Sequence, residues 1–249
     1  MSELLVRGVE GLPEFEPGMV VGAEIAARAE LGDGDVVVVS QKIVSKAEGR
    51  LRRLSSVIPG SEARRIAAAI GREPALVELV LEESAEVLRA DERGVLIVET
   101  KHGLVCANAG IDSSNLAEDD SVCLLPEDPD GSARRIRAEI AAAGGAEVGV
   151  VISDSFGRAW RLGQAEVAIG CAGLAPLDDW RGRHDAAGRE LEATVIAIAD
   201  EVASAADLVR DKASGIPAAV VRGLGRYVSA EDGPGAAALR RPREEDLFR

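Results

Sequence analysis

Aromatic side chains are scarce in this chain of 249 residues, where Phe, Trp and Tyr together make up 2%. A core must therefore be aliphatic and alanine-rich, and proteins that stack nucleic-acid bases on aromatic platforms are disfavoured. The net charge of −14 further argues against a nucleic-acid partner, because phosphate groups are repelled by an acidic surface. A nucleotide is not excluded, since a local basic pocket or a metal ion can offset the overall charge.

Long apolar runs are missing as well. No stretch approaches the roughly 20 residues that a membrane span needs, and the opening MSELLVRGVEG lacks the apolar core of a signal peptide. Hydrophobic residues nevertheless make up 47% of the chain, as in globular proteins. We expect a cytoplasmic protein with no membrane partner.

Cysteine and histidine are few. Cys106, Cys123 and Cys171 stand singly in apolar segments without a CxxC pair, which favours buried hydrophobic roles over a zinc site. The two histidines, His102 and His184, show no pattern linking them to a nucleophile. P-loop, dinucleotide-binding, HExxH and GxSxG motifs are also absent from the sequence.

Hydrophobic periodicity predicts an α/β or α+β chain with mixed sheets. Strands are expected over residues 4–9, 36–40, 94–100, 104–107, 121–125, 148–152 and 217–221. Helices are expected over residues 23–30, 61–72, 74–90, 132–143 and 195–209. Because no repeat or linker is evident, we expect one unit over residues 1–249, which two intimately associated subdomains could make up.

The stretch from Glu147 to Gly182 is the richest in polar residues that could bind a ligand or take part in catalysis. The expected strand Val148–Ile152 runs into Ser153-Asp154-Ser155, and a carboxylate beside hydroxyls suits a hard cation. Next come three side chains able to hold phosphate or carboxylate oxygens, Arg158, Arg161 and Gln164. An ordinary helix-capping Asp followed by surface arginines explains the same residues equally well.

A second Asp-Ser pair, Asp112-Ser113, also follows an apolar run. The two pairs could gather around one or two Mg²⁺ or Mn²⁺ ions, which leave positions open for phosphate. Two independent Asx turns are the alternative. Lys42 and Lys46 follow the strand over 36–40 and share a face if that stretch is helical, or else are simply solvated.

Five segments in the same order resemble the coenzyme F420-0:γ-glutamyl ligase family. They are VSQKIVSKAEGR (39–50), NAGIDSSN (108–115), SDSFGRAWRLGQAEVAIGCAGLAPLDDWRG (153–182), DAAGRELEAT (185–194) and SGIPAAVVRG (214–223). The resemblance covers nearly the whole chain. It implies the α/β fold peculiar to that family, an intertwined homodimer, and a stand-alone form without the C-terminal flavin-reductase-like domain of some relatives.

The resemblance also implies a GTP-dependent amide-forming ligase. Such an enzyme adds L-glutamate to the lactyl carboxylate of F420-0, then further γ-linked glutamate, through an acyl phosphate, with two Mg²⁺ or Mn²⁺ ions and K⁺. Phosphoryl transfer relies on charge neutralisation and alignment, so the lack of a protein nucleophile is unsurprising. The alternatives are a metal-dependent phosphohydrolase, a related carboxylate–amine ligase on another substrate, and a non-catalytic nucleotide-binding module.

By the same resemblance, Asp112 and Asp154 bind one metal ion, Ser155 binds the second, and both aspartates are catalytic together with Lys46. In the loop Arg210–Pro217 the chain departs from the family pattern. Which residue of this loop binds the second metal ion therefore stays open. Asp211 is chemically the better metal ligand, and Lys212 is the better partner for a phosphate. The expected GTP contacts are Gly11, Leu12, Pro13, Glu14, Ser40, Gln41, Lys46, Asn115, Asp211, Lys212, Ala213, Ser214 and Gly215.

Overall fold

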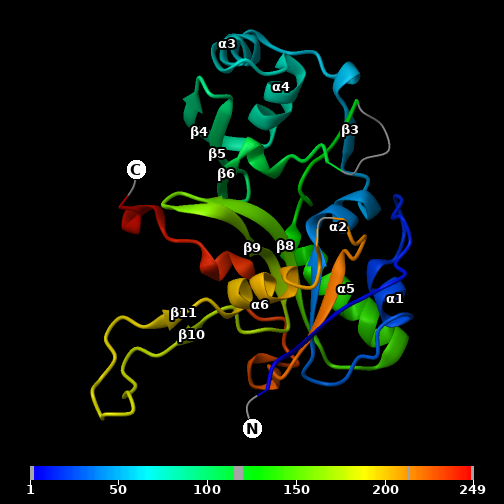
Figure 1. The fold of residues 1–249 in the computed structure, drawn as a ribbon, viewed down its shortest axis with the longest axis vertical. Helices are drawn as coiled ribbons and strands as arrows, with labels where there is room; N and C mark the ends of the chain where they lie inside the picture. Colours follow the sequence, from blue (N-terminus) through cyan, green and yellow to red (C-terminus); the bar gives the residue numbers. More distant parts are fainter. Residues whose placement is uncertain (1–2, 115–119, 212, 248–249) are drawn as a thin grey trace.

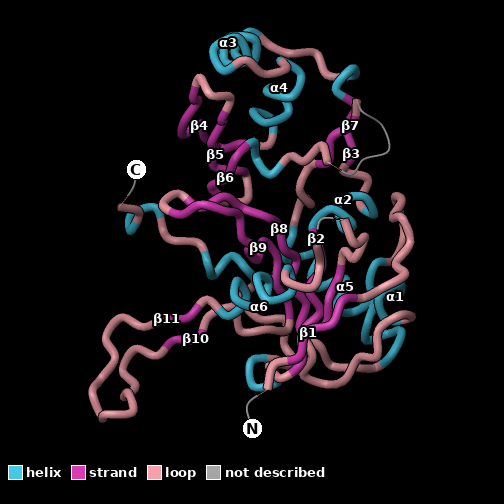
Figure 2. The backbone as a smooth tube through the Cα atoms, viewed as in Figure 1, coloured by secondary structure: helices cyan, strands magenta, loops and turns pink. Residues whose placement is uncertain are grey.

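The computed structural model describes residues 3–114, 120–211 and 213–247. In these ranges the chain forms a mixed α/β fold with a five-stranded sheet, a three-stranded sheet and two two-stranded ladders. Figure 1 shows the large sheet in the body of the molecule and the three-stranded sheet in a lobe above it. The tube view in Figure 2 shows the same division.

The five-stranded sheet has the order β1-β12-β2-β8-β9. Its strands are β1 (Leu5–Gly8), β12 (Ala218–Arg222), β2 (Val36–Ser40), β8 (Gly149–Arg158) and β9 (Arg161–Ala172). β2 and β8 run parallel, whereas the other neighbouring pairs are antiparallel. The carboxyl ends of β2 and β8 therefore lie side by side, with Ser40 opposite Ser153.

Alternation along β2 determines which helix covers which face. Val37 and Val39 belong to the core cluster that includes residues of α1 (Val21–Ala26) and α5 (Pro129–Gly144). Val36 and Val38 pack with α6 (Ile198–Asp207) instead. Because all four valines are fully buried, the sheet is the middle layer between helices, and its core is aliphatic as the sequence predicted.

The second lobe has its own core. It joins α3 (Ser61–Ile70) and α4 (Pro74–Glu82) to the antiparallel sheet β4-β5-β6. The strands of that sheet are β4 (Ser84–Asp91), β5 (Val95–Thr100) and β6 (Val105–Ala107).

Shorter elements complete the chain. The ladder of β3 (Leu51–Arg53) and β7 (Ser121–Cys123) lies beside the second lobe, and β10 (Asp178–Asp179) pairs with β11 (Val195–Ile196) in an arm that projects from the body (Figure 1). α2 (Gln41–Ala47) directly follows β2. The 3₁₀ turns are η1 (Leu54–Ser56), η2 (Asn108–Gly110), η3 (Gly225–Tyr227), η4 (Ala236–Leu239) and η5 (Arg243–Glu245).

The structure corrects the helix predicted over residues 74–90. α4 ends at Glu82, and Ser84–Asp91 forms β4, which pairs with β5. Burial largely alternates along β4, so a period of two governs this segment, and pairing with β5 overrides its helix-forming Ala, Glu and Leu. Similarly, Val195–Ile196 is β11 rather than the start of α6.

The structure also corrects the end of the strand predicted over 148–152. β8 continues through Asp154 to Arg158 because β9 folds back and pairs with it, which places Ser155 opposite Glu166. Asp154 therefore lies within a strand and caps no helix.

The three cysteines are buried and unpaired with one another, as predicted. None of the helices in the described ranges combines the length and apolar character needed to cross a bilayer.

Candidate functional site

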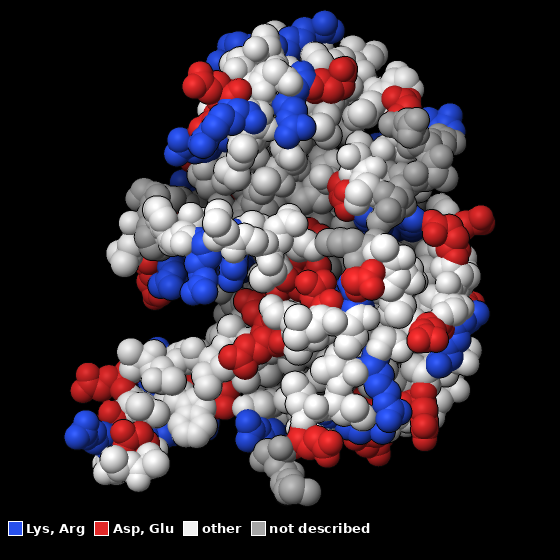
Figure 3. Space-filling view, in the orientation of Figure 1, with Lys and Arg blue, Asp and Glu red and all other residues white. Residues whose placement is uncertain are grey.

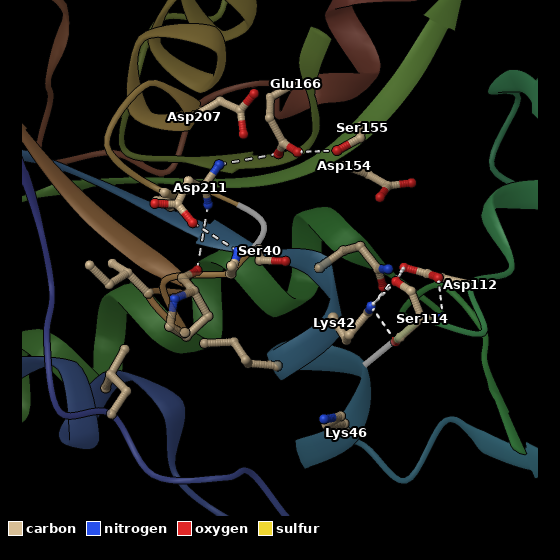
Figure 4. Close-up of a pocket in the computed structure, with 18 of the residues that line it drawn as sticks. Ser40, Lys42, Lys46, Asp112, Ser114, Asp154, Ser155, Glu166, Asp207 and Asp211 are labelled. Atoms are coloured by element: carbon tan, nitrogen blue, oxygen red, sulfur yellow. Dashed lines mark hydrogen bonds and ion pairs between the residues drawn. The ribbon is translucent and has the colours of Figure 1, made fainter. Parts of the chain in front are cut away.

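A cavity of about 410 Å³ lies at the carboxyl ends of β2 and β8. Its walls come from the turn at residues 12–14, from β2 and α2, from the β8–β9 hairpin and from residues 207–217. Figure 3 shows acidic side chains gathered in the hollow at the middle of the molecular face, and Figure 4 shows the residues that line the cavity. This is the sheet edge at which open α/β proteins bind ligands.

Lys42 holds the loop that carries Asp112. The Lys42 Nζ lies 2.7 Å from Asp112 Oδ2 and donates to the Ser114 carbonyl oxygen at 2.8 Å. The Ser114 N–H in turn donates to Asp112 Oδ1 at 2.7 Å. Burial raises the pKa of Asp112, but these bonds outweigh it and hold the pKa below its usual value, so the carboxyl is ionised.

Lys46 lies one turn further along α2 and is 7% exposed. Its ammonium group pairs with Glu14, which brings the turn at residues 12–14 against the cavity. β2 turns into α2 at Ser40 without an intervening loop, which directs both lysines toward the cavity (Figure 4). The spacing of four residues therefore did predict a shared face.

A buried ionic network underlies the opposite wall. Glu166 Oε1 accepts from Ser155 Oγ at 2.6 Å, and Glu166 Oε2 accepts from Arg210 Nη2 at 3.2 Å. The same Nη2 lies 3.0 Å from Ser153 Oγ. The Glu166 and Arg210 side chains are only 8% and 4% exposed. The network thus ties the β8–β9 hairpin to the start of the loop Arg210–Pro217.

Sequence reasoning missed Glu166 and Asp207. It did not assign Lys42, Ser114 or Arg210 individually to the site, although Arg210 begins the loop that was expected to contact the nucleotide. Glu166 carried a usable signal, because it is a single acid among the small and apolar residues of β9. A buried position in the sheet implies a partner for such an acid. Which partner it has depends on the hairpin register, which the sequence pattern did not reveal.

The donor set suits a hard divalent cation. Carboxylates of Asp112, Asp154 and Asp211 and the hydroxyl of Ser155 all line the cavity. Within the described ranges, no three Asp, Glu, His or Cys side chains come close enough together to form a metal centre by themselves. Mg²⁺ usually binds through one or two protein carboxylates and completes its shell with phosphate and water. The residues therefore fit a metal ion that takes only one or two protein carboxylates.

Most of the expected site residues lie together. Those lining the cavity are Leu12, Pro13, Glu14, Ser40, Gln41, Lys46, Asp112, Asp154, Ser155, Asp211, Ala213 and Gly215. Gly11 and Ser214 adjoin lining residues without lining the cavity themselves. Asn115 and Lys212 fall outside the described residues.

The expected substrate contacts are more dispersed. Arg158 and Arg161 are exposed at the end of the β8–β9 hairpin, where the Arg158 guanidinium donates to the Leu162 carbonyl oxygen at 2.6 Å. Neither arginine lines the cavity. Gln164 lines a neighbouring cavity. The substrate roles of these three residues stay predictions.

Comparison with known protein families assigns most of the chain to one family. The family model described as F420-0:Gamma-glutamyl ligase matches residues 11–223, a range that spans every expected site residue. The chain belongs to the F420-0:gamma-glutamyl ligase family. The resemblance found in the sequence is thereby confirmed.

Three relatives illustrate the family, each named coenzyme F420:L-glutamate ligase. That of Methanothermobacter thermautotrophicus is 45% identical over 248 residues, 97% of both chains. That of Archaeoglobus fulgidus is 46% identical over 97% of this chain and 94% of its own. That of Methanocaldococcus jannaschii is 42% identical over 98% and 96%. The similarity to these ligases therefore extends through both the sheet body and the second lobe.

Proposed function

We propose that this protein is a GTP-dependent ligase that joins L-glutamate to the lactyl carboxylate of F420-0 and then adds further γ-linked glutamate. Family membership supports the substrates, since the relatives carry the name coenzyme F420:L-glutamate ligase. One observation carries the nucleotide-dependent part: the two lysines of α2 and the two aspartates Asp112 and Asp154 line a single cavity at the carboxyl ends of β2 and β8.

The reaction needs two steps because a carboxylate is a poor acylating group. A carboxylate oxygen first bonds to the γ-phosphorus of GTP, the bond from that phosphorus to the β,γ-bridging oxygen breaks, and GDP leaves. The amine nitrogen of glutamate then bonds to the acyl carbon, and the bond from that carbon to the phosphate oxygen breaks. Of the two protons that the ammonium group gives up, one goes to the departing phosphate and one to solvent.

The side chains suit positioning and charge neutralisation, which dominate phosphoryl transfer. Lys46 and Lys42 hold phosphate oxygens, and Leu12, Pro13, Ser40 and Gln41 form the wall against which the nucleotide lies. Asp112 and Asp154 would hold one Mg²⁺ or Mn²⁺, and Ser155 with Asp211 the other. A bound divalent ion neutralises charge on the transferred phosphoryl group. A monovalent K⁺ ion would assist the two divalent ions.

We also propose that two copies form an intertwined homodimer. The arm of β10 and β11 projects from the body (Figure 1), and among the described residues these two strands pair only with each other. A two-stranded ribbon is marginally stable alone, so packing against a second copy would stabilise it. Size-exclusion chromatography with light scattering tests this assembly, and a monomer at micromolar concentration would contradict it.

The test of the activity is a single incubation with GTP, Mn²⁺, F420-0 and labelled L-glutamate, followed by mass spectrometry of the product. Wild-type protein should yield glutamylated F420, and Asp154→Asn should abolish the product. Glu92→Gln, which changes an exposed acid of the second lobe, is the matched control and should retain activity. Phosphate release without glutamylated product would instead indicate a phosphohydrolase, and nucleotide binding without turnover would indicate a binding module.

A further inference from the structure

The Ser155 hydroxyl group has its single proton committed to Glu166. Ser155 Oγ lies 2.6 Å from Glu166 Oε1, and the bond lies on the cavity wall opposite the lysines of α2 (Figure 4). Because a hydroxyl carries one proton and a carboxylate carries none, Ser155 is the donor. The Ser155 oxygen can therefore offer only lone pairs to a group in the cavity. A cation binds lone pairs, whereas a proton in the same direction would repel it.

The register of the β8–β9 hairpin determines where Glu166 lies. Glu166 is paired directly with Ser155, and Ser153 lies two residues earlier in β8, on the same face. Arg210 Nη2 donates to Glu166 Oε2 at 3.2 Å and to Ser153 Oγ at 3.0 Å. Both oxygens of the Glu166 carboxylate are thus engaged. The Glu166 side chain is also only 8% exposed, so it has little freedom to turn toward other partners.

Glu166 itself is poorly suited to bind a cation. The Arg210 guanidinium lies 3.2 Å from one of its carboxylate oxygens, and the positive charge opposes a second cation there. Ser155 and Glu166 both line the first cavity, but of these two described residues only Ser155 also lines an adjoining cavity of about 380 Å³. Ser155 thus borders both cavities, as Asp112 and Asp154 do, whereas Glu166 stands behind its hydroxyl group.

We propose that Glu166 is a positioning residue that acts through Ser155. Its carboxylate holds the hydroxyl proton away from the cavity and raises the electron density on the Ser155 oxygen, which strengthens that oxygen as a ligand of a divalent ion. The inference rests on the proposed function, in which Ser155 binds the second Mg²⁺ or Mn²⁺. Outer partners of this kind orient metal ligands, and their loss typically weakens metal binding by about 10–100-fold.

Mn²⁺ binding tests the proposal without turnover. Electron paramagnetic resonance measures the free ion in titrations of the protein with a non-hydrolysable GTP analogue present. The variants are Glu166→Gln, Ser155→Ala and the two substitutions together. Glu166→Gln keeps the size of the side chain and an oxygen that can accept from Ser155, but it removes the charge. Glu201→Gln, which changes an exposed acid of α6 outside both cavities, is the matched control.

Glu166→Gln and Ser155→Ala should each raise the Kd of one Mn²⁺ ion by roughly tenfold or more, whereas the control should bind like wild type. In the Ser155→Ala background, Glu166→Gln should change that Kd by less than about twofold, because the hydroxyl through which it acts is gone. An equal loss in that background would overturn the proposal, since Glu166 would then bind the ion directly or act through the fold. Unchanged affinity in Glu166→Gln would overturn it as well.

A further variant separates positioning from loss of structure. Glu166→Gln leaves the buried Arg210 charge without its Glu166 partner, whereas Glu166→Gln combined with Arg210→Met leaves neither charge. Both variants lack the carboxylate behind Ser155, so both should bind Mn²⁺ with similarly weakened affinity. Recovery of wild-type affinity in the combined variant would mean that the unpaired arginine, and not the lost carboxylate, weakens binding. That result would overturn the proposal.

The product assay keeps this proposal apart from the proposed function. Wild-type protein that makes no glutamylated product contradicts the ligase proposal, whatever the Mn²⁺ titrations show. Unchanged Mn²⁺ affinity in Ser155→Ala contradicts Ser155 as a metal ligand, and with it the positioning role of Glu166. Weakened affinity in Ser155→Ala with unchanged affinity in Glu166→Gln contradicts the role of Glu166 alone.

Discussion

The ionic network of Glu166 and Arg210 makes a quantitative prediction for Glu166→Gln. The substitution keeps the shape and an oxygen that can accept from Ser155, but it removes the charge that faces Arg210. The Arg210 side chain is 4% exposed, so water cannot replace the lost partner. Removing one partner of a buried ion pair costs about 3–5 kcal/mol, and the retained hydrogen bond together with the nearby Asp207 carboxylate places the expected loss near the lower value.

Urea unfolding followed by far-UV circular dichroism measures this loss. With a slope of about 3 kcal/mol per molar, the midpoint of Glu166→Gln should fall by about 1 M. Arg210→Met and the double variant complete a thermodynamic cycle. Because removing both charges leaves none unpaired, the double variant should lose much less stability than the sum of the single losses. Glu201→Gln, an exposed acid on α6, is the matched control and should unfold like wild type.

Two results would refute this reasoning. A loss below about 1 kcal/mol for Glu166→Gln would mean that the pair contributes no more than an exposed ion pair. Losses that simply add in the double variant would mean that Glu166 and Arg210 do not interact energetically. Since the pair ties the β8–β9 hairpin to the loop Arg210–Pro217, either result would also remove the structural reason for a fixed cavity wall.

Three further predictions concern other residues. Lys46→Met should raise the KM for GTP by roughly tenfold or more, because a charge-assisted phosphate contact is lost; an unchanged KM would remove Lys46 from the nucleotide site. Burial raises the pKa of Asp35, but bonds from Arg222 and the Gly32 amide outweigh it and lower the pKa overall. The pair therefore stabilises the fold at neutral pH and loses this effect as the pH falls below about 4. Asp35→Asn should accordingly lower the Tm at pH 7 more than at pH 3, and equal losses would contradict this. Burial also raises the pKa of the Cys106 thiol to about 12, so iodoacetamide at pH 8 should label it only after unfolding; rapid labelling of the native protein would contradict this.

Local sequence patterns predicted well the part of the site that is formed by β2, α2 and the two aspartates Asp112 and Asp154. The valine run of β2 and the polar residues after it located both the strand end and the two lysines of α2. The aspartates of the two Asp-Ser pairs, Asp112 and Asp154, also line one cavity, as the resemblance of the two pairs to each other suggested. These features depend on residues close together in the chain, which periodicity and turn chemistry describe.

Long-range pairing accounts for what the sequence did not predict. Ser84–Asp91 has helix-forming residues, and β5 makes it a strand. The pairing of β8 with β9 places Glu166 opposite Ser155. Arg210, which lies much later in the chain, donates a hydrogen bond to Glu166 and so completes the buried ionic network. Sheet register and contacts between residues 44 positions apart are tertiary properties, which no local pattern encodes.

Oxygen transfer tests the proposed reaction most directly. F420-0 labelled with ¹⁸O in its lactyl carboxylate is incubated with GTP, Mn²⁺ and L-glutamate, and the released phosphate is analysed by mass spectrometry. If the carboxylate attacks the γ-phosphorus, one ¹⁸O atom passes from the acid to the phosphate released in the first addition of glutamate, and the other stays in the amide. Phosphate that carries no ¹⁸O while glutamylated product accumulates would contradict an acyl phosphate and with it the proposed mechanism.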